Sequence, residues 1–134
     1  MDALCGDIKI ERDQFSGESR YTSPLSMSIS FKKLVNNGKE ATYMTLSTIS
    51  KISTKGNGVL INFERGYQIK KEVASNVFEN ENGEYVHYVE ILLNKNDISL
   101  LKNYQITTFT IYMYASGVDN NFRYMAYMHC LSKI

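Results

Sequence analysis

Two neighbouring residues near the end of the chain, His129 and Cys130, carry the imidazole and the thiol that nucleophilic catalysis can combine. Adjacent side chains of a β-strand point to opposite faces, so His129 is badly placed to activate Cys130. A buried thiol beside a surface imidazole explains the pair more simply. Cys5 with His87 or His129 would need a contact between distant segments that no pattern indicates.

A second candidate for chemistry is Glu90, which shares an otherwise apolar strand face with Val86, Tyr88 and Leu92. A small enzyme with a site around Glu90 and either His87 or His129 is therefore one hypothesis. A glutamate that reaches solvent or pairs with a lysine explains the same pattern. No second carboxylate is placed beside it, as glycoside hydrolysis requires. We predict no catalytic residue and favour a non-catalytic protein.

The sequence shows no spacing typical of a metal or cofactor site. Its two histidines and two cysteines include neither His-x-His nor Cys-x-x-Cys. Asp119-Asn120-Asn121 gathers oxygen atoms, but a turn explains them and the acidic spacing of an EF-hand is missing. Gly56-Asn57-Gly58 precedes a predicted strand, whereas a phosphate loop precedes a helix. We therefore predict neither a metal nor a cofactor.

The charge balance argues against a nucleic-acid partner. Lys and Arg total 15 against 14 Asp and Glu, and the net charge is +1. The members of Lys32-Lys33 and of Lys70-Lys71 point to opposite strand faces, so they make no basic stripe along which a phosphate backbone could lie. No apolar run approaches the ~18 residues of a membrane helix. We expect neither nucleic-acid binding nor a membrane span.

The two cysteines, Cys5 and Cys130, lie near opposite ends of the chain. A disulfide between them is one alternative, but cysteine is also among the most commonly buried residues, and we favour two free thiols. The first residues show neither a basic leader nor an apolar stretch. The compartment is then cytoplasmic by default, or extracytoplasmic if an export signal was removed.

The composition favours β-strands. Ile, Val and Thr number 27 and the aromatic residues 16, whereas alanine, the best helix former, appears only 5 times. Branched and aromatic side chains fit a pleated sheet and lose rotamer freedom in a helix. The chain is therefore predicted to be all-β.

The clearest hairpin surrounds Asn37-Gly38, the dipeptide that best accepts a two-residue type I′ turn. The preceding segment, residues 25–34, alternates apolar and polar residues, with Met27, Ile29 and Phe31 on one face. A two-residue turn pairs Phe31 with Met44 and Ile29 with Leu46. Because both pairs join apolar residues, this register is strongly favoured over a one-residue slip.

Further turn signals divide the middle of the chain into strands. Asn82-Gly83, read as a two-residue turn, joins residues 76–80 to 84–93 and pairs Phe78 with His87. Gly66 joins strands at 59–63 and 67–71. One short helix is predicted over 96–103, with Asn96 as its N-cap.

The last predicted hairpin, residues 106–115 and 122–131, carries the most informative surface. Its outer face is expected to gather aromatic, basic and thioether side chains, namely Tyr112, Tyr114, Arg123, Met125, Tyr127 and His129. Tyrosine and arginine are enriched in binding surfaces, so a protein partner, a second copy of the chain or, less favoured because Trp is absent, a glycan could bind here. The alternative is that another part of the same chain covers this face.

These elements predict one domain over residues 1–134, with residues 1–6 loose. Hairpins at short spacing favour an antiparallel β-sandwich of eight or nine strands, with a partly closed barrel as the alternative.

Three segments together resemble the layout of small uncharacterised bacterial all-β domains: Asp13-Gln14-Phe15-Ser16-Gly17-Glu18, Asp97-Ile98-Ser99-Leu100-Leu101 and Ile106-Thr107-Thr108-Phe109. They cover under a fifth of the chain. The resemblance implies an all-β fold and a bacterial origin, and it implies no activity.

Overall fold

A computed structural model describes residues 5–24, 28–119 and 121–134. Within these residues the fold consists mainly of antiparallel strands, with two α-helices and one short 3-10 helix. The elements are β1 (Lys9–Arg12), β2 (Ser19–Thr22), β3 (Ile29–Asn36), β4 (Lys39–Ser50), β5 (Asn57–Phe63), η1 (Glu64–Gly66), β6 (Gln68–Ala74), β7 (Asn76–Glu79), β8 (Tyr85–Leu93), α2 (Lys95–Asn103), β9 (Ile106–Ile111), β10 (Tyr114–Gly117) and α3 (Asn121–Ser132).

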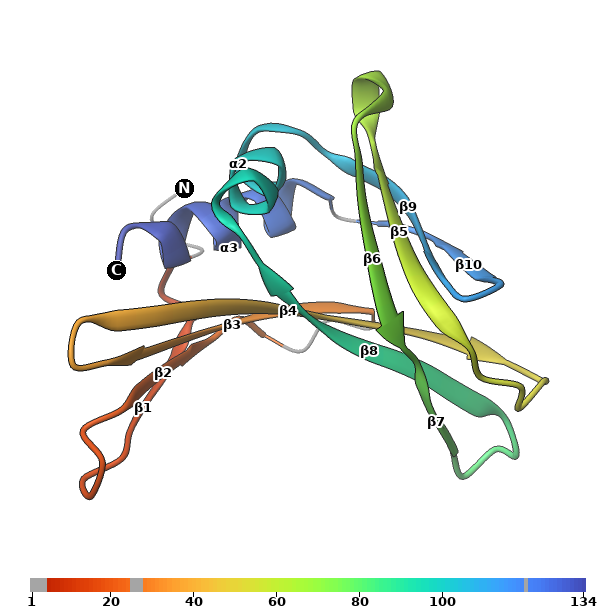
Figure 1. The fold of residues 1–134 in the computed structure, drawn as a ribbon, viewed down its shortest axis with the longest axis horizontal. Coiled ribbons are helices and arrows are strands. Elements are labelled where there is room, and N and C mark those ends of the chain that lie inside the picture. The colour runs from red at the N-terminus through yellow and green to blue at the C-terminus, as the bar shows by residue number, and fades with distance from the viewer. Residues whose placement is uncertain (1–4, 25–27, 120) are drawn as a thin grey trace.

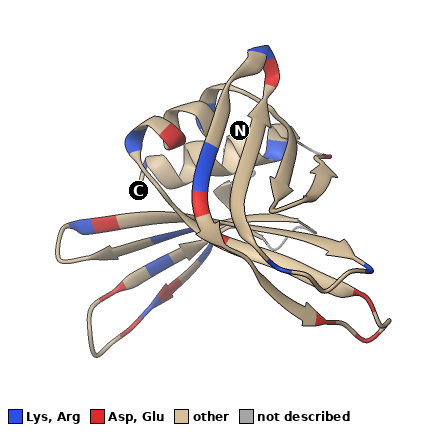
Figure 2. Cartoon of the chain, turned by 45° about the vertical axis from the view of Figure 1, so that its right-hand side comes forward, with Lys and Arg blue, Asp and Glu red and all other residues tan. Residues whose placement is uncertain are grey.

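The strands form two sheets (Figure 1). The larger has the order β1-β2-β3-β4-β8-β7, and the smaller has the order β10-β9-β5-β6. The chain passes from the small sheet to the large one where β6 leads through Ser75 into β7. Neither sheet closes into a barrel within the described part of the chain. Figure 2 shows basic and acidic residues interspersed over the large sheet and along β6, whereas β5, β9 and β10 of the small sheet carry none.

The Asn37-Gly38 hairpin has the predicted register. Phe31 pairs with Met44 and Ile29 with Leu46, and all four side chains are buried. Asn37 has φ of 52° and Gly38 has φ of 79°, the two positive values that a type I′ turn needs. The first residues of the predicted strand, 25–27, lie outside the described residues.

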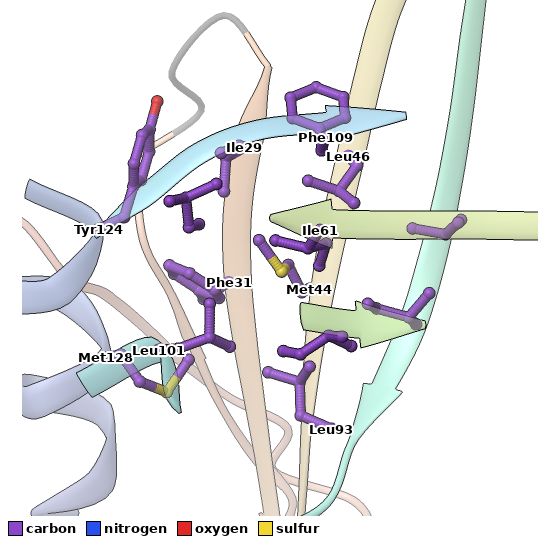
Figure 3. Close-up of a cluster of buried hydrophobic side chains, with 14 of the residues drawn as sticks. Ile29, Phe31, Met44, Leu46, Ile61, Leu93, Leu101, Phe109, Tyr124 and Met128 are labelled. Carbon is purple, nitrogen blue, oxygen red and sulfur yellow. The ribbon is translucent and has the colours of Figure 1, made fainter. Parts of the chain in front are cut away.

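One hydrophobic core connects the inner faces of both sheets with the two helices (Figure 3). Helix α3 packs against β3, where the ring of Tyr124 meets that of Phe31 edge-on at 6.5 Å. The predicted helix is present as α2, but its N-cap is Asn94, two residues before the predicted Asn96. Asn94 is the N-cap because Asp97, three residues later, completes a capping box with it.

The predicted strand over residues 122–131 is wrong, because this segment forms helix α3. Its buried side chains include Tyr124, Tyr127, Met128 and Leu131, which have the i, i+3, i+4, i+7 spacing of a helix face. Alternation through Tyr124, Ala126 and Met128 fits the same residues, so the pattern alone was ambiguous. The hairpin partner of β9 is β10, which returns immediately after a turn at Tyr112 and Met113, and β5 pairs with the other side of β9.

The register predicted for the Asn82-Gly83 hairpin is off by one residue. Phe78 pairs with Val86, and His87 pairs with Val77. The loop has three residues, because the backbone N–H of Asn80 already donates to the carbonyl of Glu84 at 2.8 Å. The Asn80 side chain also accepts from the backbone N–H groups of Asn82 and Glu84, which favours this longer loop.

The expected free thiols are also wrong, since Cys5 and Cys130 form a disulfide. Cys130 is buried, as predicted, but it lies on the side of α3 that faces the N-terminal turn. The Tyr127 hydroxyl, one helical turn earlier, approaches the carboxylate of Asp7 at 3.4 Å. Cys5 is therefore tied down, whereas residues 1–4 of the predicted loose segment lie outside the described residues.

Candidate functional site

The outer face of the small sheet carries a shallow pocket of about 210 Å³. Its floor comes from the paired central strands β5 and β9, where Leu60 lies opposite Thr110. The neighbouring strand β6 contributes Lys70, which pairs with Leu60, and Glu72. Tyr112 forms the wall at the end of β9. Because Val59 and Ile61 point into the core, strand alternation places Leu60 on the outer face.

Tyr112 is held in an unusual conformation. It is the first residue of the two-residue β9–β10 turn and has φ of 55°, in the left-handed region that bulky residues rarely adopt. Its backbone N–H donates to the carbonyl of Gly58 at 2.8 Å. Its ring lies over Gly56, where a Cβ atom would come within 2.4 Å of Tyr112 Cδ1. The side chain nevertheless stays 40% exposed, so a strained tyrosine is presented to solvent at the pocket.

Two stacked rings beneath Tyr112 fix the loop that contains Gly56. The buried rings of His87 and Tyr114 are stacked, with their centroids 4.0 Å apart and their planes at 23°. The Tyr114 hydroxyl donates to the carbonyl of Thr54 at 2.6 Å, and His87 Nε2 lies 2.7 Å from the carbonyl of Ile52. An Nε2–H donor is required there, and the buried Nδ1 of His87 has no partner among the described residues. Hydrogen bonds to the carbonyl groups of Ile52 and Thr54 thus hold the loop in place.

Polar side chains form a directed chain of hydrogen bonds across the same outer face. Gln68 Nε2 donates to Asn62 Oδ1 at 2.9 Å, and Asn62 Nδ2 donates to Thr108 Oγ1 at 3.1 Å. This row lies two residues along each strand from the row of Lys70, Leu60 and Thr110. The hydrogen-bonded polar row therefore lies beside the row that contains Leu60.

The charges at the pocket balance. Lys70 and Glu72 occupy alternate positions on the outer side of β6, and Figure 2 shows basic and acidic residues following one another along this strand. The intervening Lys71 turns to the other side and pairs with Asp97 of α2 at 2.7 Å. The pocket thus combines one cation with one anion, and Lys71 is already neutralised.

The larger groove of about 640 Å³ between the start of β4 and the start of α2 is less suited to a ligand. Lys71 in its wall is bound to Asp97, and Glu40 lies 3.4 Å from Lys33. Lys33 itself is buried and donates to the carbonyls of Leu131 and Ile134, so it stabilises the end of α3. These groups therefore serve the fold.

The six residues of the predicted binding face do not share one surface, because the second strand predicted for that face is helix α3. Tyr112 is exposed at the pocket, whereas Tyr114 points inward beneath it. The other four residues belong to α3: Arg123 is exposed, Met125 and His129 are half-buried, and Tyr127 lies in the core. Burial raises the pKa of the Tyr127 hydroxyl, and the negative charge of Asp7 adds to the effect.

The structure does not bring together the residues of the enzyme hypothesis. Glu90 lies on the outer face of β8 and pairs with Lys32 at 3.2 Å, the simpler of the two sequence interpretations. His87 belongs to the inner face of the same strand and is fully buried. His129 lies on α3, which packs against the inner side of β3.

Sequence reasoning missed most of the pocket. Gly56, Leu60, Lys70 and Glu72 were not identified as site residues. The alternation of Gln68, Lys70 and Glu72 along one strand could have indicated a polar face. The contact of Tyr112 with Gly56 joins residues far apart in the sequence, and no local pattern predicts it.

Among the described residues, no group of three or more His, Cys, Asp or Glu side chains is placed to hold a metal ion. No helix in this part of the chain is long and apolar enough to cross a membrane. Comparison with known proteins gives no match to a family model, to a curated protein or to a solved structure.

Proposed function

We propose that this protein is a non-catalytic binding module whose ligand lies on the outer face of the small sheet, against Tyr112. The observation that carries the proposal is the conformation of Tyr112, which has positive φ, rests on Gly56 and is exposed beside the pocket. Such backbone strain costs about 1–3 kcal/mol and clusters at binding and active sites. The hydrogen-bonded loop and the stacked ring pair limit the positions that the tyrosine can take, which lowers the entropy lost when a ligand binds.

We further propose that the module is a β-sandwich. Support comes from the shared core, in which Ile61 and Phe109 of the small sheet belong to the same buried cluster as Met44 and Leu46 of the large sheet. Two antiparallel sheets that bury their inner faces against each other have this arrangement. Helices α2 and α3 would then cover the part of the large sheet that the small sheet does not reach.

The disulfide supports a proposal for the compartment. Disulfides persist in oxidising environments and are rare in the reducing cytosol. The Cys5–Cys130 bond therefore favours an extracytoplasmic site of action over the cytoplasmic default. Candidate ligands in that environment are extracellular polymers and the surfaces of other cells.

The proposal is tested by comparing the wild-type protein with Tyr112→Ala and with a matched control, Tyr88→Ala. Tyr88 is also an exposed tyrosine, but it lies on the outer face of the large sheet. The probes are an array of oligosaccharides and an array of short peptides, with sedimentation velocity to detect self-association. We expect binding that Tyr112→Ala weakens about tenfold and Tyr88→Ala leaves unchanged. Binding that both variants retain, or that only Tyr88→Ala removes, contradicts the proposed site.

A further inference from the structure

We infer that the ligand of the Tyr112 pocket is a neutral saccharide, an inference that rests on the proposed function. A sugar ring presents C–H groups on its faces and hydroxyl groups around its edge. A complementary protein surface therefore needs an apolar ring or side chain beside hydrogen-bonding groups that both donate and accept. The outer face of the small sheet offers both within two adjacent rows of side chains.

The apolar component consists of the Tyr112 ring and the side chain of Leu60. The ring forms a wall at one end of the pocket, and Leu60 forms part of the floor between Lys70 and Thr110. Tyrosine provides a large, stiff contact surface with a hydroxyl at its tip. This arrangement suits the C–H face of a sugar lying against the wall.

The polar component is the chain from Gln68 through Asn62 to Thr108. Each link uses one donor and one acceptor, so the chain has a direction. Because Thr108 Oγ1 accepts from Asn62, its O–H remains available to donate at one end, and the Gln68 carbonyl oxygen can accept at the other end. Hydrogen bonds in such a chain polarise one another and strengthen the terminal donor. Sugar hydroxyls, which both donate and accept, match these two ends.

The charges favour a neutral ligand over an anionic one. Glu72 offsets Lys70 on the same side of β6, and Lys71 is occupied by Asp97. A phosphate or carboxylate ligand would meet the Glu72 carboxylate at the pocket and lose much of the attraction of Lys70. A sugar can instead accept from the Lys70 ammonium and donate to Glu72 with two neighbouring hydroxyls.

The backbone arrangement argues against an extended peptide lying across the floor of the pocket. Peptides that add a strand to a sheet bind at an edge, where backbone N–H and C=O groups are unpaired. The floor of this pocket comes from β5 and β9, each of which has a strand on both sides. Their backbone groups are used within the sheet, so the floor offers a ligand side chains alone. A strand-adding peptide would instead lie along β6, an edge strand of this sheet, and not across the Tyr112 ring and Leu60.

The experiment is isothermal titration calorimetry of the full chain with two sets of probes. The first set contains neutral cello-, xylo-, manno-, malto- and chito-oligosaccharides, and the second contains acidic oligogalacturonides. Thr108→Val removes the terminal hydroxyl with little change in shape. Thr45→Val on the outer face of the large sheet is the matched control. Thermal unfolding of both variants shows whether they are folded, and Leu60→Ser provides a second variant at the pocket floor.

We expect at least one neutral oligosaccharide to bind, with affinity about tenfold lower in Thr108→Val and Leu60→Ser and unchanged in Thr45→Val. A tenfold preference for the acidic probes overturns the inference of a neutral ligand. If no oligosaccharide binds but short peptides of the array bind through Tyr112, the saccharide inference fails while the proposed function stands. If neither saccharides nor peptides bind and the protein does not self-associate through Tyr112, both fail.

Discussion

The ring of Tyr112 lies so close to Gly56 that a Cβ atom added to the glycine would come within 2.4 Å of the ring. The glycine therefore serves a packing purpose, since Gly56 does not itself have positive φ. Its loop is held by the carbonyl contacts of His87 and Tyr114 and by the hydrogen bond from Gly56 N–H to Ser75 Oγ at 3.1 Å. The position of the exposed tyrosine is thus set by residues buried beneath it.

Replacing Gly56 by alanine should displace the Tyr112 ring and weaken ligand binding. The half-exposed ring can swing outward, so we expect a modest loss of stability, about 1 kcal/mol, at the low end for overpacking. Gly117→Ala is the control, because a Cβ there meets nothing within 4 Å. Denaturant unfolding and oligosaccharide titration measure the two effects. Equal affinity in the two variants would show that the Gly56 contact does not position Tyr112.

Replacing Gly38 by valine should destabilise the protein by about 1 kcal/mol or more, because a β-branched residue is strained at positive φ. Gly38 has φ of 79° in the β3–β4 turn, and a Cβ there would meet no neighbouring atom. The cost therefore reports the backbone conformation alone. A chemical denaturation curve gives the change in unfolding free energy, and an unchanged midpoint would contradict the turn assignment.

The disulfide should contribute strongly to stability, because it closes a loop with a sequence separation of 125 residues. Chain-entropy arguments give about 4–5 kcal/mol for a loop of this size, with measured values often lower. We expect the double variant Cys5→Ala with Cys130→Ala to unfold at a much lower denaturant concentration. Thiol titration of the unfolded, unreduced wild type should find no free thiol. Two reactive thiols in that titration would contradict the bond.

Lys33 and Glu40 form an ion pair whose two members should differ greatly in importance. The Lys33 side chain is only 4% exposed, and it donates to the carbonyls of Leu131 and Ile134, whereas Glu40 is 61% exposed. Lys33→Ala leaves carbonyl groups at the end of α3 without their donor, at a cost of about 1–3 kcal/mol. Glu40→Gln should cost less than about 1 kcal/mol, as exposed ion pairs do. Equal losses of unfolding free energy in the two variants would show that the ion pair, rather than the carbonyl contacts, stabilises the fold.

The sequence predicted those parts of the fold in which two independent signals agree. At Asn37-Gly38 the turn dipeptide and the apolar faces of both strands require the same register, and the structure has it. At Asn82-Gly83 only the dipeptide was used, and hydrogen bonds to the Asn80 side chain lengthen the loop by one residue. Local patterns settle a hairpin only when a second constraint fixes its register.

The candidate site was less accessible to prediction, because its residues come from distant segments. Tyr112 was identified from its residue type, but its predicted neighbours on residues 122–131 belong to a helix. Apolar residues at 124, 127, 128 and 131 fit a helix, and those at 124, 126 and 128 fit a strand, so periodicity could not decide. Only the three-dimensional arrangement places Gly56, Leu60 and Lys70 near Tyr112.

The most direct test of the binding account is the location of the bound ligand, observed by amide chemical-shift changes when the neutral oligosaccharides are titrated into isotope-labelled protein. The account predicts that the largest changes fall on residues 56–62, 68–72 and 108–114, and that Tyr112→Ala removes them. Changes centred on the outer face of the large sheet, around Tyr88 and Glu90, would contradict it.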